Sequence, residues 1–182
     1  MEILITVISS VISLAIGGWI AWHFTKKTYY AQVENQITLN EKLVILCDRT
    51  RMLETLYAMY DKANAGDIIW GQSVSGNILG DLTRRVVVAA QRGVKFELIF
   101  SEDALKDTSL KKEVVLLFQQ LNNAKVHIRN DNNIRIQGLS DKEILIALPS
   151  NTKYVSVLIK DEAIVRVFRN WFSSRFNTQE EI

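Results

Sequence analysis

The chain has 182 residues, enough for one sizeable hydrophobic core and too few for two domains of ordinary size. Its 22 basic and 20 acidic residues give a net charge of +2, a balance too even to indicate nucleic-acid binding by bulk electrostatics. The one cysteine, Cys47, excludes an intramolecular disulfide and any cysteine-rich metal site. We also expect no metal and no cofactor.

The first segment is apolar. Residues 3–24 carry no charged side chain, and as a helix they would span roughly 30 Å, the thickness of a hydrocarbon core. We predict a transmembrane anchor over residues 1–27. A cleaved signal peptide is the alternative, although the start is not basic and the apolar run ends in "WIAWHF". Lys26 and Lys27 follow, and the positive-inside rule then predicts a single-pass cell-membrane protein with its N-terminus outside and its domain in the cytoplasm.

Small residues recur every four positions along one face of this segment, which indicates either self-association in the bilayer or ordinary transmembrane composition. They are Ser9, Ser13, Gly17 and Ala21. Residues 28–41 contain no Pro or Gly and carry Val33 and Ile37 at helical spacing. The pattern predicts a helical juxtamembrane stalk there.

Residues 42–177 alternate between patterns typical of strands and of amphipathic helices, with a short tail at 178–182. The predicted strands lie at 42–46, 67–74, 94–100, 125–129, 133–137, 143–148 and 154–160. The predicted helices lie at 48–66, 78–93, 109–122 and 161–176. Asp48 and Asp161 are expected to cap the first and last helices, and Gly66 and Gly93 to follow the first two. This order predicts one α/β sandwich with a mixed sheet.

Two stretches connect the pattern with a known family. Arg92, Gly93 and Val94 join a helix to a buried strand in "AAQRGVKFELIF", and the chain closes with the aromatic-rich helix "IVRVFRNWFSSRF". In both, residues 42–177 resemble the phospholipase D-like superfamily, and above all its half-size members with one domain per chain. The resemblance implies an α/β/α sandwich.

The chemistry of that superfamily resides in a His-x-Lys-x4-Asp motif. The resemblance implies that two motifs, from two halves or two chains, meet at one site. One histidine attacks phosphorus, the other protonates the leaving group, and the lysines neutralise phosphate charge. When Asp141 is set on the family aspartate, Ile134 takes the place of the histidine and Ile136 that of the lysine.

The positions after the motif are partly retained. The family often has Gly-Ser and then Asn, where this chain has Leu148 and Pro149 and then Asn151. A slip of one residue within the motif offers only Arg135 and Gln137, neither of which attacks phosphorus. We therefore expect no enzyme activity of the family type, unless another polypeptide supplies a competent motif.

One other stretch imitates the motif. His127 and Arg129 reproduce the His-x-Lys spacing, but Ile134 stands where the aspartate would be. A strand histidine at a sheet edge is the simpler interpretation of His127. If the chain is an enzyme after all, its catalytic residues would be His127, Asp141 and Asn151.

The same fold without the motif resembles the ligand-binding half of archaeal TrmB-like sugar-responsive regulators. That resemblance draws attention to "GQSVSGN", a polar stretch at the carboxyl end of a predicted strand, where open sheets bind ligands. An ordinary capped turn is the alternative. The candidate ligand-binding residues are Gln72, Ser73, Ser75, Asn77, Ser101, Glu102 and Asn151.

Three functions remain open. The first is a membrane-anchored, catalytically inactive phospholipase D-like module that homodimerises and binds a small molecule or a protein partner of unknown identity. The second is a phosphodiesterase, a nuclease or phospholipase, which the fold alone would suggest. The third is a structural scaffold of a membrane oligomer. Nucleic acid is not an expected partner.

Overall fold

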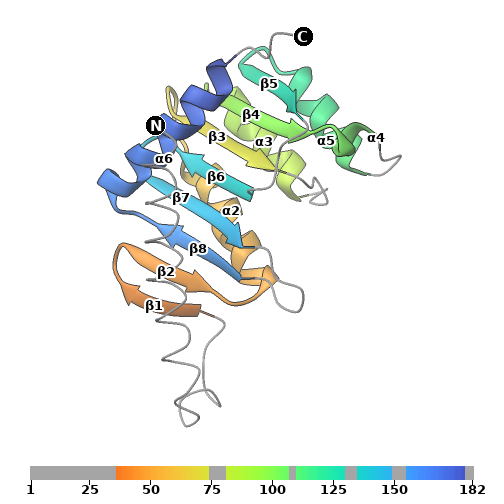
Figure 1. The fold of residues 1–182 in the computed structure, drawn as a ribbon. Coiled ribbons are helices and arrows are strands. Elements are labelled where there is room, and N and C mark those ends of the chain that lie inside the picture. The colour runs from red at the N-terminus through yellow and green to blue at the C-terminus, as the bar shows by residue number, and fades with distance from the viewer. Residues whose placement is uncertain (1–35, 74–80, 107–109, 130–134, 149–154, 179–182) are drawn as a thin grey trace. The chain divides into compact units, whose positions relative to one another are not determined.

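An eight-stranded sheet organises the part of the chain that this computed structural model describes, residues 36–73, 81–106, 110–129, 135–148 and 155–178. The sheet order is β1-β2-β8-β7-β6-β3-β4-β5 (Figure 1). The strands are β1 (Gln36–Asn40), β2 (Leu43–Leu46), β3 (Ile68–Ser73), β4 (Lys95–Ser101), β5 (Ala124–Arg129), β6 (Arg135–Leu139), β7 (Glu143–Leu148) and β8 (Val155–Ile159). β3, β4 and β5 are parallel, and the other neighbours pair antiparallel. The predicted mixed sheet is confirmed.

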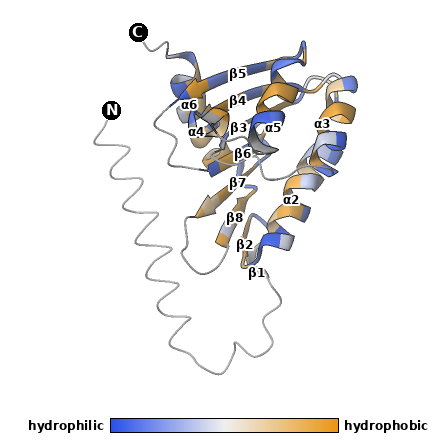
Figure 2. Ribbon diagram, turned by 90° about the vertical axis from the view of Figure 1, so that its right-hand side faces the viewer, coloured by the Kyte–Doolittle hydropathy of each residue, from blue (hydrophilic) through white to orange (hydrophobic). Residues whose placement is uncertain are grey.

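Helices lie on both faces of the sheet. Figure 2 shows α2, α3 and α5 on one side and α6 on the other. The helices are α2 (Arg49–Lys62), α3 (Asp81–Gln91), α4 (Asp103–Lys106), α5 (Leu110–Gln119) and α6 (Glu162–Asn177). The short α4 was not predicted, because its four residues are too few to show a helical period.

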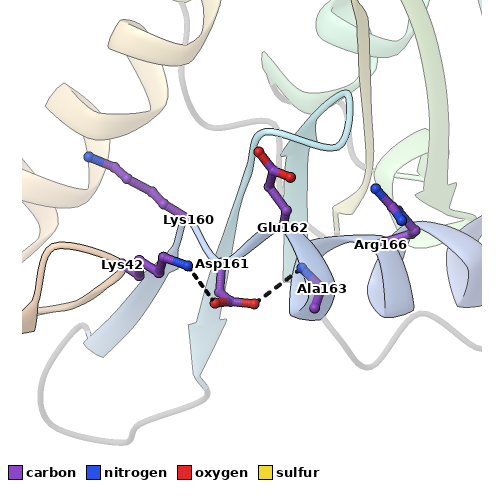
Figure 3. A pocket seen from close by; sticks show the side chains of 6 residues that line it. All are labelled: Lys42, Lys160, Asp161, Glu162, Ala163 and Arg166. Carbon is purple, nitrogen blue, oxygen red and sulfur yellow. Dashed lines mark hydrogen bonds and ion pairs between the residues drawn. The ribbon is translucent and has the colours of Figure 1, made fainter.

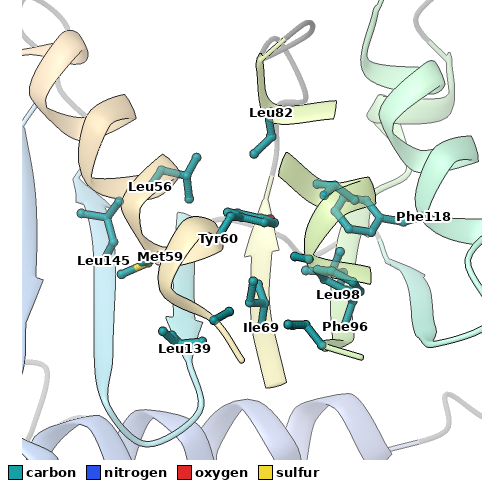
Figure 4. Close-up of a cluster of buried hydrophobic side chains, with 14 of the residues drawn as sticks. Leu56, Met59, Tyr60, Ile69, Leu82, Phe96, Leu98, Phe118, Leu139 and Leu145 are labelled. Atoms are coloured by element: carbon teal, nitrogen blue, oxygen red, sulfur yellow. The ribbon is translucent and has the colours of Figure 1, made fainter. Parts of the chain in front are cut away.

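Two apolar cores follow from the alternation of side chains along each strand. Figure 4 shows the larger one, where Tyr60, Phe96 and Phe118 lie between the helices and the sheet. The rings of Phe96 and Phe118 are 5.3 Å apart between centroids. The second core lies under α6, where the rings of Trp70 and Phe172 are 5.2 Å apart. The central strands are therefore buried on both faces.

The two predicted helix caps are confirmed. The carboxylate of Asp48 accepts a hydrogen bond from the Arg51 amide at 2.9 Å, and that of Asp161 accepts from the Ala163 and Ile164 amides at 3.1 and 3.3 Å. The first helix ends at Lys62 and not at Gly66. Gly66 instead has a φ of +87° in the turn before β3, a conformation that costs glycine little.

The stalk prediction for residues 28–41 is corrected over its last part. Gln36–Asn40 form strand β1, which pairs antiparallel with β2, with Ile37 opposite Ile45. The apolar spacing looked helical, but a neighbouring strand edge offers this segment a ladder of backbone hydrogen bonds, interrupted by a register shift between Thr38 and Asn40. The predicted anchor at 1–27 and the remainder of the stalk lie outside the described residues. None of the helices within the described ranges is long and apolar enough to cross a membrane.

Candidate functional site

Strand β6 contains most of the stretch that the resemblance sets on the family motif, with Ile136 at the position matched to the lysine. The side chain of Ile136 is 3% exposed and belongs to the core under α6, together with Trp70 and Phe176. In the sheet it lies between Gln72 on β3 and Ile146 on β7. A cation at this position would have no water and no room, so the site that neutralises phosphate in the family is an apolar core position here. Ile134, at the histidine position, lies outside the described residues.

The middle of β6 is fixed by the indole of Trp70. A side chain at Gly138 would meet the indole carbons Cε2 and Cζ2 and would lie 2.7 Å from the indole nitrogen Nε1. That nitrogen donates to the carbonyl of Ser140 at 2.8 Å. The absence of a side chain at Gly138 therefore lets the aromatic ring cross the strand, and the ring in turn holds the end of β6.

A polar network ties the turn after β6 to the start of β3. The Ser140 hydroxyl donates to the Asp67 carboxylate at 2.9 Å, and the Lys142 ammonium contacts both oxygens of that carboxylate at 2.7 and 2.8 Å. Ser140 has a φ of +47°, a strained conformation for a residue with a side chain. Asp141 is exposed on this turn, at the opposite end of β6 from the beginning of the motif.

The Asp67 network makes the stability of the domain pH-dependent. Burial alone would raise the pKa of Asp67, but hydrogen bonds from Lys142, the Asn64 amide and Ser140 hold the pKa below its usual value of 3.8. Because the folded pKa is depressed, the stabilisation is present above the unfolded pKa and is lost as pH falls through the folded one. We expect the unfolding midpoint to fall as the pH drops below about 4. In Asp67→Asn, thermal melts between pH 6 and pH 2 should show a smaller loss, and an unchanged loss would contradict this role.

His127 lies on β5, the edge strand, and away from the motif strand. Three strand spacings separate β5 from β6, which is roughly 14 Å. The imidazole is half-buried and stacks on Phe176, with 4.2 Å between ring centroids. Burial and the nearby cations Arg129 and Lys125 lower the pKa of His127, so the ring is neutral near pH 7. His127 and Asp141 are therefore not brought together, and Asn151 lies outside the described residues.

Polar side chains lie near the carboxyl ends of the three parallel strands. Gln72 is 2% exposed, and its side-chain oxygen accepts a hydrogen bond from Arg175 of α6 at 2.9 Å. Buried Ser101 lies opposite buried Arg129 in the β4–β5 ladder, and Arg129 donates to the backbone carbonyl of Thr178. These contacts fasten the end of α6 to the sheet. The polar cluster is defined by Gln72, Ser101, Arg129 and Arg175.

Two of the other predicted ligand-binding residues, Glu102 and Ser73, also lie at the ends of strands. Half-buried Glu102 follows β4 directly, and its amide donates to the Arg129 carbonyl at 3.1 Å. Ser73 ends β3, beside Gln72. Ser75 and Asn77 lie outside the described residues, as does Asn151. Sequence reasoning missed the two arginines of the polar cluster. In the sequence, Arg175 is one of many basic residues on amphipathic helices. Only the path of α6 across the sheet brings its side chain to Gln72.

A second polar contact lies farther back along α6. The Arg169 guanidinium contacts the Glu97 carboxylate on β4 at 2.6 Å and lies over the Trp70 ring, 5.5 Å from its centroid. This pair is largely buried. It explains why a charged residue is placed on the side of α6 that packs on the sheet, because the carboxylate and the aromatic face together replace water.

A shallow hollow lies at the start of α6 (Figure 3), with a volume of about 480 Å³. Its lining residues are Lys42, Lys160, Asp161, Glu162, Ala163 and Arg166. The Lys42 ammonium contacts the Asp161 carboxylate at 3.1 Å. That contact and the helix amides hold the pKa of Asp161 below its usual value of 3.8. The hollow is therefore built around a helix cap, and not around the motif strand.

Comparison with known proteins supports the fold. No family model and no curated protein matches the chain. TrmBL2, an archaeal chromatin protein whose structure shows a novel mode of DNA binding, aligns with a TM-score of 0.62 and 16% identity over 100% of this chain and 67% of its own. NucT from Helicobacter pylori aligns with a TM-score of 0.62 and 15% identity, over 73% and 94% of the two chains.

Nuc from Salmonella typhimurium, a phospholipase D family member, has a TM-score of 0.52 and 13% identity over 75% of this chain and 95% of its own. Likeness at these identities establishes a fold and does not by itself carry an activity.

Proposed function

We propose, from the premise that this chain has a phospholipase D-like fold, that it is a membrane-anchored, catalytically inactive module that homodimerises and binds a ligand or a protein partner. One observation carries the proposal: Ile136, at the position of the family lysine, is 3% exposed in the core under α6. The apolar run at residues 3–24 supports the anchor, and its flanking lysines support a cytoplasmic domain.

The absence of catalysis follows from what the family reaction needs. Attack on a phosphodiester requires an imidazole nucleophile beside cations that neutralise the phosphate. Isoleucines stand at the positions of both the histidine and the lysine. His127 lies on β5, which is three strand spacings, or roughly 14 Å, from β6. A buried Ile136 at the lysine position supports the proposal that this domain keeps the fold and uses it for binding.

A direct assay tests this absence. The full chain in detergent should release no more nitrophenol from bis(p-nitrophenyl) phosphate than buffer does. His127→Ala should give the same rate as the unaltered chain. Cleavage that disappears in His127→Ala would overturn the inactive-module proposal and favour the phosphodiesterase alternative.

The homodimer is proposed from an apolar surface at the motif end of the sheet. Half-buried Ile146 and Leu148 end β7, and half-buried Val155 begins β8 opposite Leu148. In the family that this chain resembles, the two halves or chains pair across the face that carries the motif. Ile136 itself is covered by α6 and offers a partner no surface, so the contact would rest on these three side chains.

Sedimentation of the full chain in detergent tests the dimer. We expect a dimer at micromolar concentration, weakened by Ile146→Asp, because an interface aspartate would lose its water. Val88→Asp, the same apolar-to-acidic change at an exposed position on α3, is the matched control and should leave the dimer intact. A monomer for the unaltered chain would contradict the proposal.

The ligand would bind at the carboxyl ends of β3, β4 and β5, beside the polar cluster. Glu102 is half-buried there, and Arg175 and Gln72 already hold each other. A thermal-shift panel of sugars, nucleotides and lipid headgroups tests this site, with Glu102→Gln as the variant that should lose the shift. A flat panel would favour the scaffold alternative.

A further inference from the structure

Helix α6 carries an apolar ridge at the edge of the side packed on the sheet, because Phe168 and Trp171 pack against the core under α6 whereas Ile164 and Val167 are exposed. Ile164, Val167, Phe168 and Trp171 follow one another at the i, i+3, i+4, i+7 spacing that places residues on one helical face. Ile164 is 44% exposed and Val167 is 51% exposed, and the two aromatic residues are half-buried. Among the described residues, the remaining exposed large apolar side chains occur singly on α3, α4 and α5.

Basic side chains lie at the same end of α6 as the exposed part of this ridge, with Arg166 about 100° around the helix from Val167. Lys160 and Arg166 are exposed at the start of α6, and both line the hollow of Figure 3 together with Lys42. The hollow contains three basic against two acidic side chains, and the Asp161 charge is compensated by Lys42 and by the helix amides. An apolar ridge beside excess positive charge is the pattern of a helix that lies in an anionic lipid interface.

The length of the connecting chain places a membrane within reach. Eight residues lie between Lys27, the end of the proposed anchor, and Gln36, where β1 begins. Fully extended they would span at most roughly 30 Å. The turn after β1 contains Lys42, whose backbone carbonyl accepts from the Lys160 amide at 2.7 Å, next to the start of α6. The first turn of α6 is therefore within one strand length of the tether.

We propose that the ridge of α6 docks onto the surface of an anionic membrane, with Ile164 and Val167 entering the interface and Lys160 and Arg166 contacting lipid phosphates. The inference rests on the proposed anchor. Two partly exposed aliphatic side chains and a small excess charge give an affinity of only about millimolar. A short tether supplies lipid headgroups at about that effective concentration, so the contact forms in the anchored chain and not in a free domain.

Depth-dependent quenching in vesicles tests the docking. The full chain would carry Cys47→Ala and a dye on Ala163→Cys, an exposed position beside the ridge. In vesicles of equal parts phosphatidylcholine and phosphatidylglycerol, nitroxide-labelled lipid should quench this dye strongly. The same dye on Glu113→Cys, exposed on α5 at the other face of the sheet, should remain unquenched. Quenching that is equal at both positions, or absent at both, would overturn the docking.

Variants separate the parts of the contact. Val167→Asp, and separately Lys160→Glu with Arg166→Glu, should remove most of the quenching at position 163, while Lys125→Glu should leave it unchanged. Unaltered quenching in the first two would overturn the assignment of the ridge. Dye self-quenching that grows with protein density, without nitroxide quenching, would mean that a second copy covers the ridge, and would also overturn it.

Flotation with lipid vesicles distinguishes a failure of the proposed anchor from a failure of the proposed docking of α6. The chain should float with phosphatidylcholine vesicles at high salt through its anchor alone. A chain that does not float would overturn the anchor itself. A chain that floats but shows no quenching at position 163 would overturn only the docking.

Discussion

Ile136→Lys is expected to lower the free energy of unfolding by on the order of 4 kcal/mol, although it restores the family residue at that position. The side chain is 3% exposed beneath α6, among aliphatic and aromatic neighbours. A lysine there must either bury an unpaired ammonium or enter the core uncharged with a strongly depressed pKa. Chemical denaturation of the full chain in detergent, followed by circular dichroism, measures the loss.

The pH dependence identifies the cause. A buried lysine has a folded pKa below its unfolded value, so its penalty is greatest below the folded pKa and shrinks as the pH rises from there toward about 10. Ile136→Met keeps the position apolar and should cost about 1 kcal/mol with no such dependence. A stable Ile136→Lys variant that cleaves a phosphodiester would contradict both the core assignment and the proposed inactivity.

Gly138→Ala should lower the free energy of unfolding by about 2 kcal/mol. In an ordinary strand, this change would gain up to about 1 kcal/mol by reducing the freedom of the unfolded chain. Here the added methyl group would collide with the Trp70 indole, which is completely buried and cannot move aside. The steric cost should exceed the entropic gain. In the variant, the hydrogen bond from the indole to the Ser140 carbonyl would be strained as well.

A double-mutant cycle provides the control for Gly138→Ala. Leucine at position 70 lacks the three indole atoms that the methyl group would meet. Trp70→Leu is destabilising by itself, but the additional cost of Gly138→Ala in that background should vanish or become a gain. Equal costs in the two backgrounds, measured by thermal melts, would show that the collision is not the cause.

The order of strands and helices could be predicted from the sequence because each element carries its own pattern. The caps at Asp48 and Asp161 and the buried strand "VKFELIF" are local features, and the structure confirms them. The phospholipase D-like fold, inferred from two short stretches and this order, is supported by the solved structures. The segment of strand β1 was predicted as helix from the spacing of two apolar residues. The prediction failed because pairing with β2 decides the conformation of this segment.

The candidate site could be predicted only in part. Gln72 and Ser101 were expected at the carboxyl ends of neighbouring strands, and they do lie near the ends of β3 and β4, while their role in binding stays a prediction. Their partners Arg129 and Arg175 come from an edge strand and from the last helix, and no local pattern links residues so far apart in the chain. The membrane anchor stays a prediction.

The sequence by itself determined that the family histidine and lysine are absent, since identity at a motif position needs no structure. Only the tertiary structure decided that Ile136, at the lysine position, is buried in a core. Alternation along β6 does not tell which face α6 covers, whereas the packing of α6 across the sheet makes Ile136 a core residue and sets His127 on a distant strand. Local patterns fix what a segment prefers, but burial and proximity depend on which other segments pack against it.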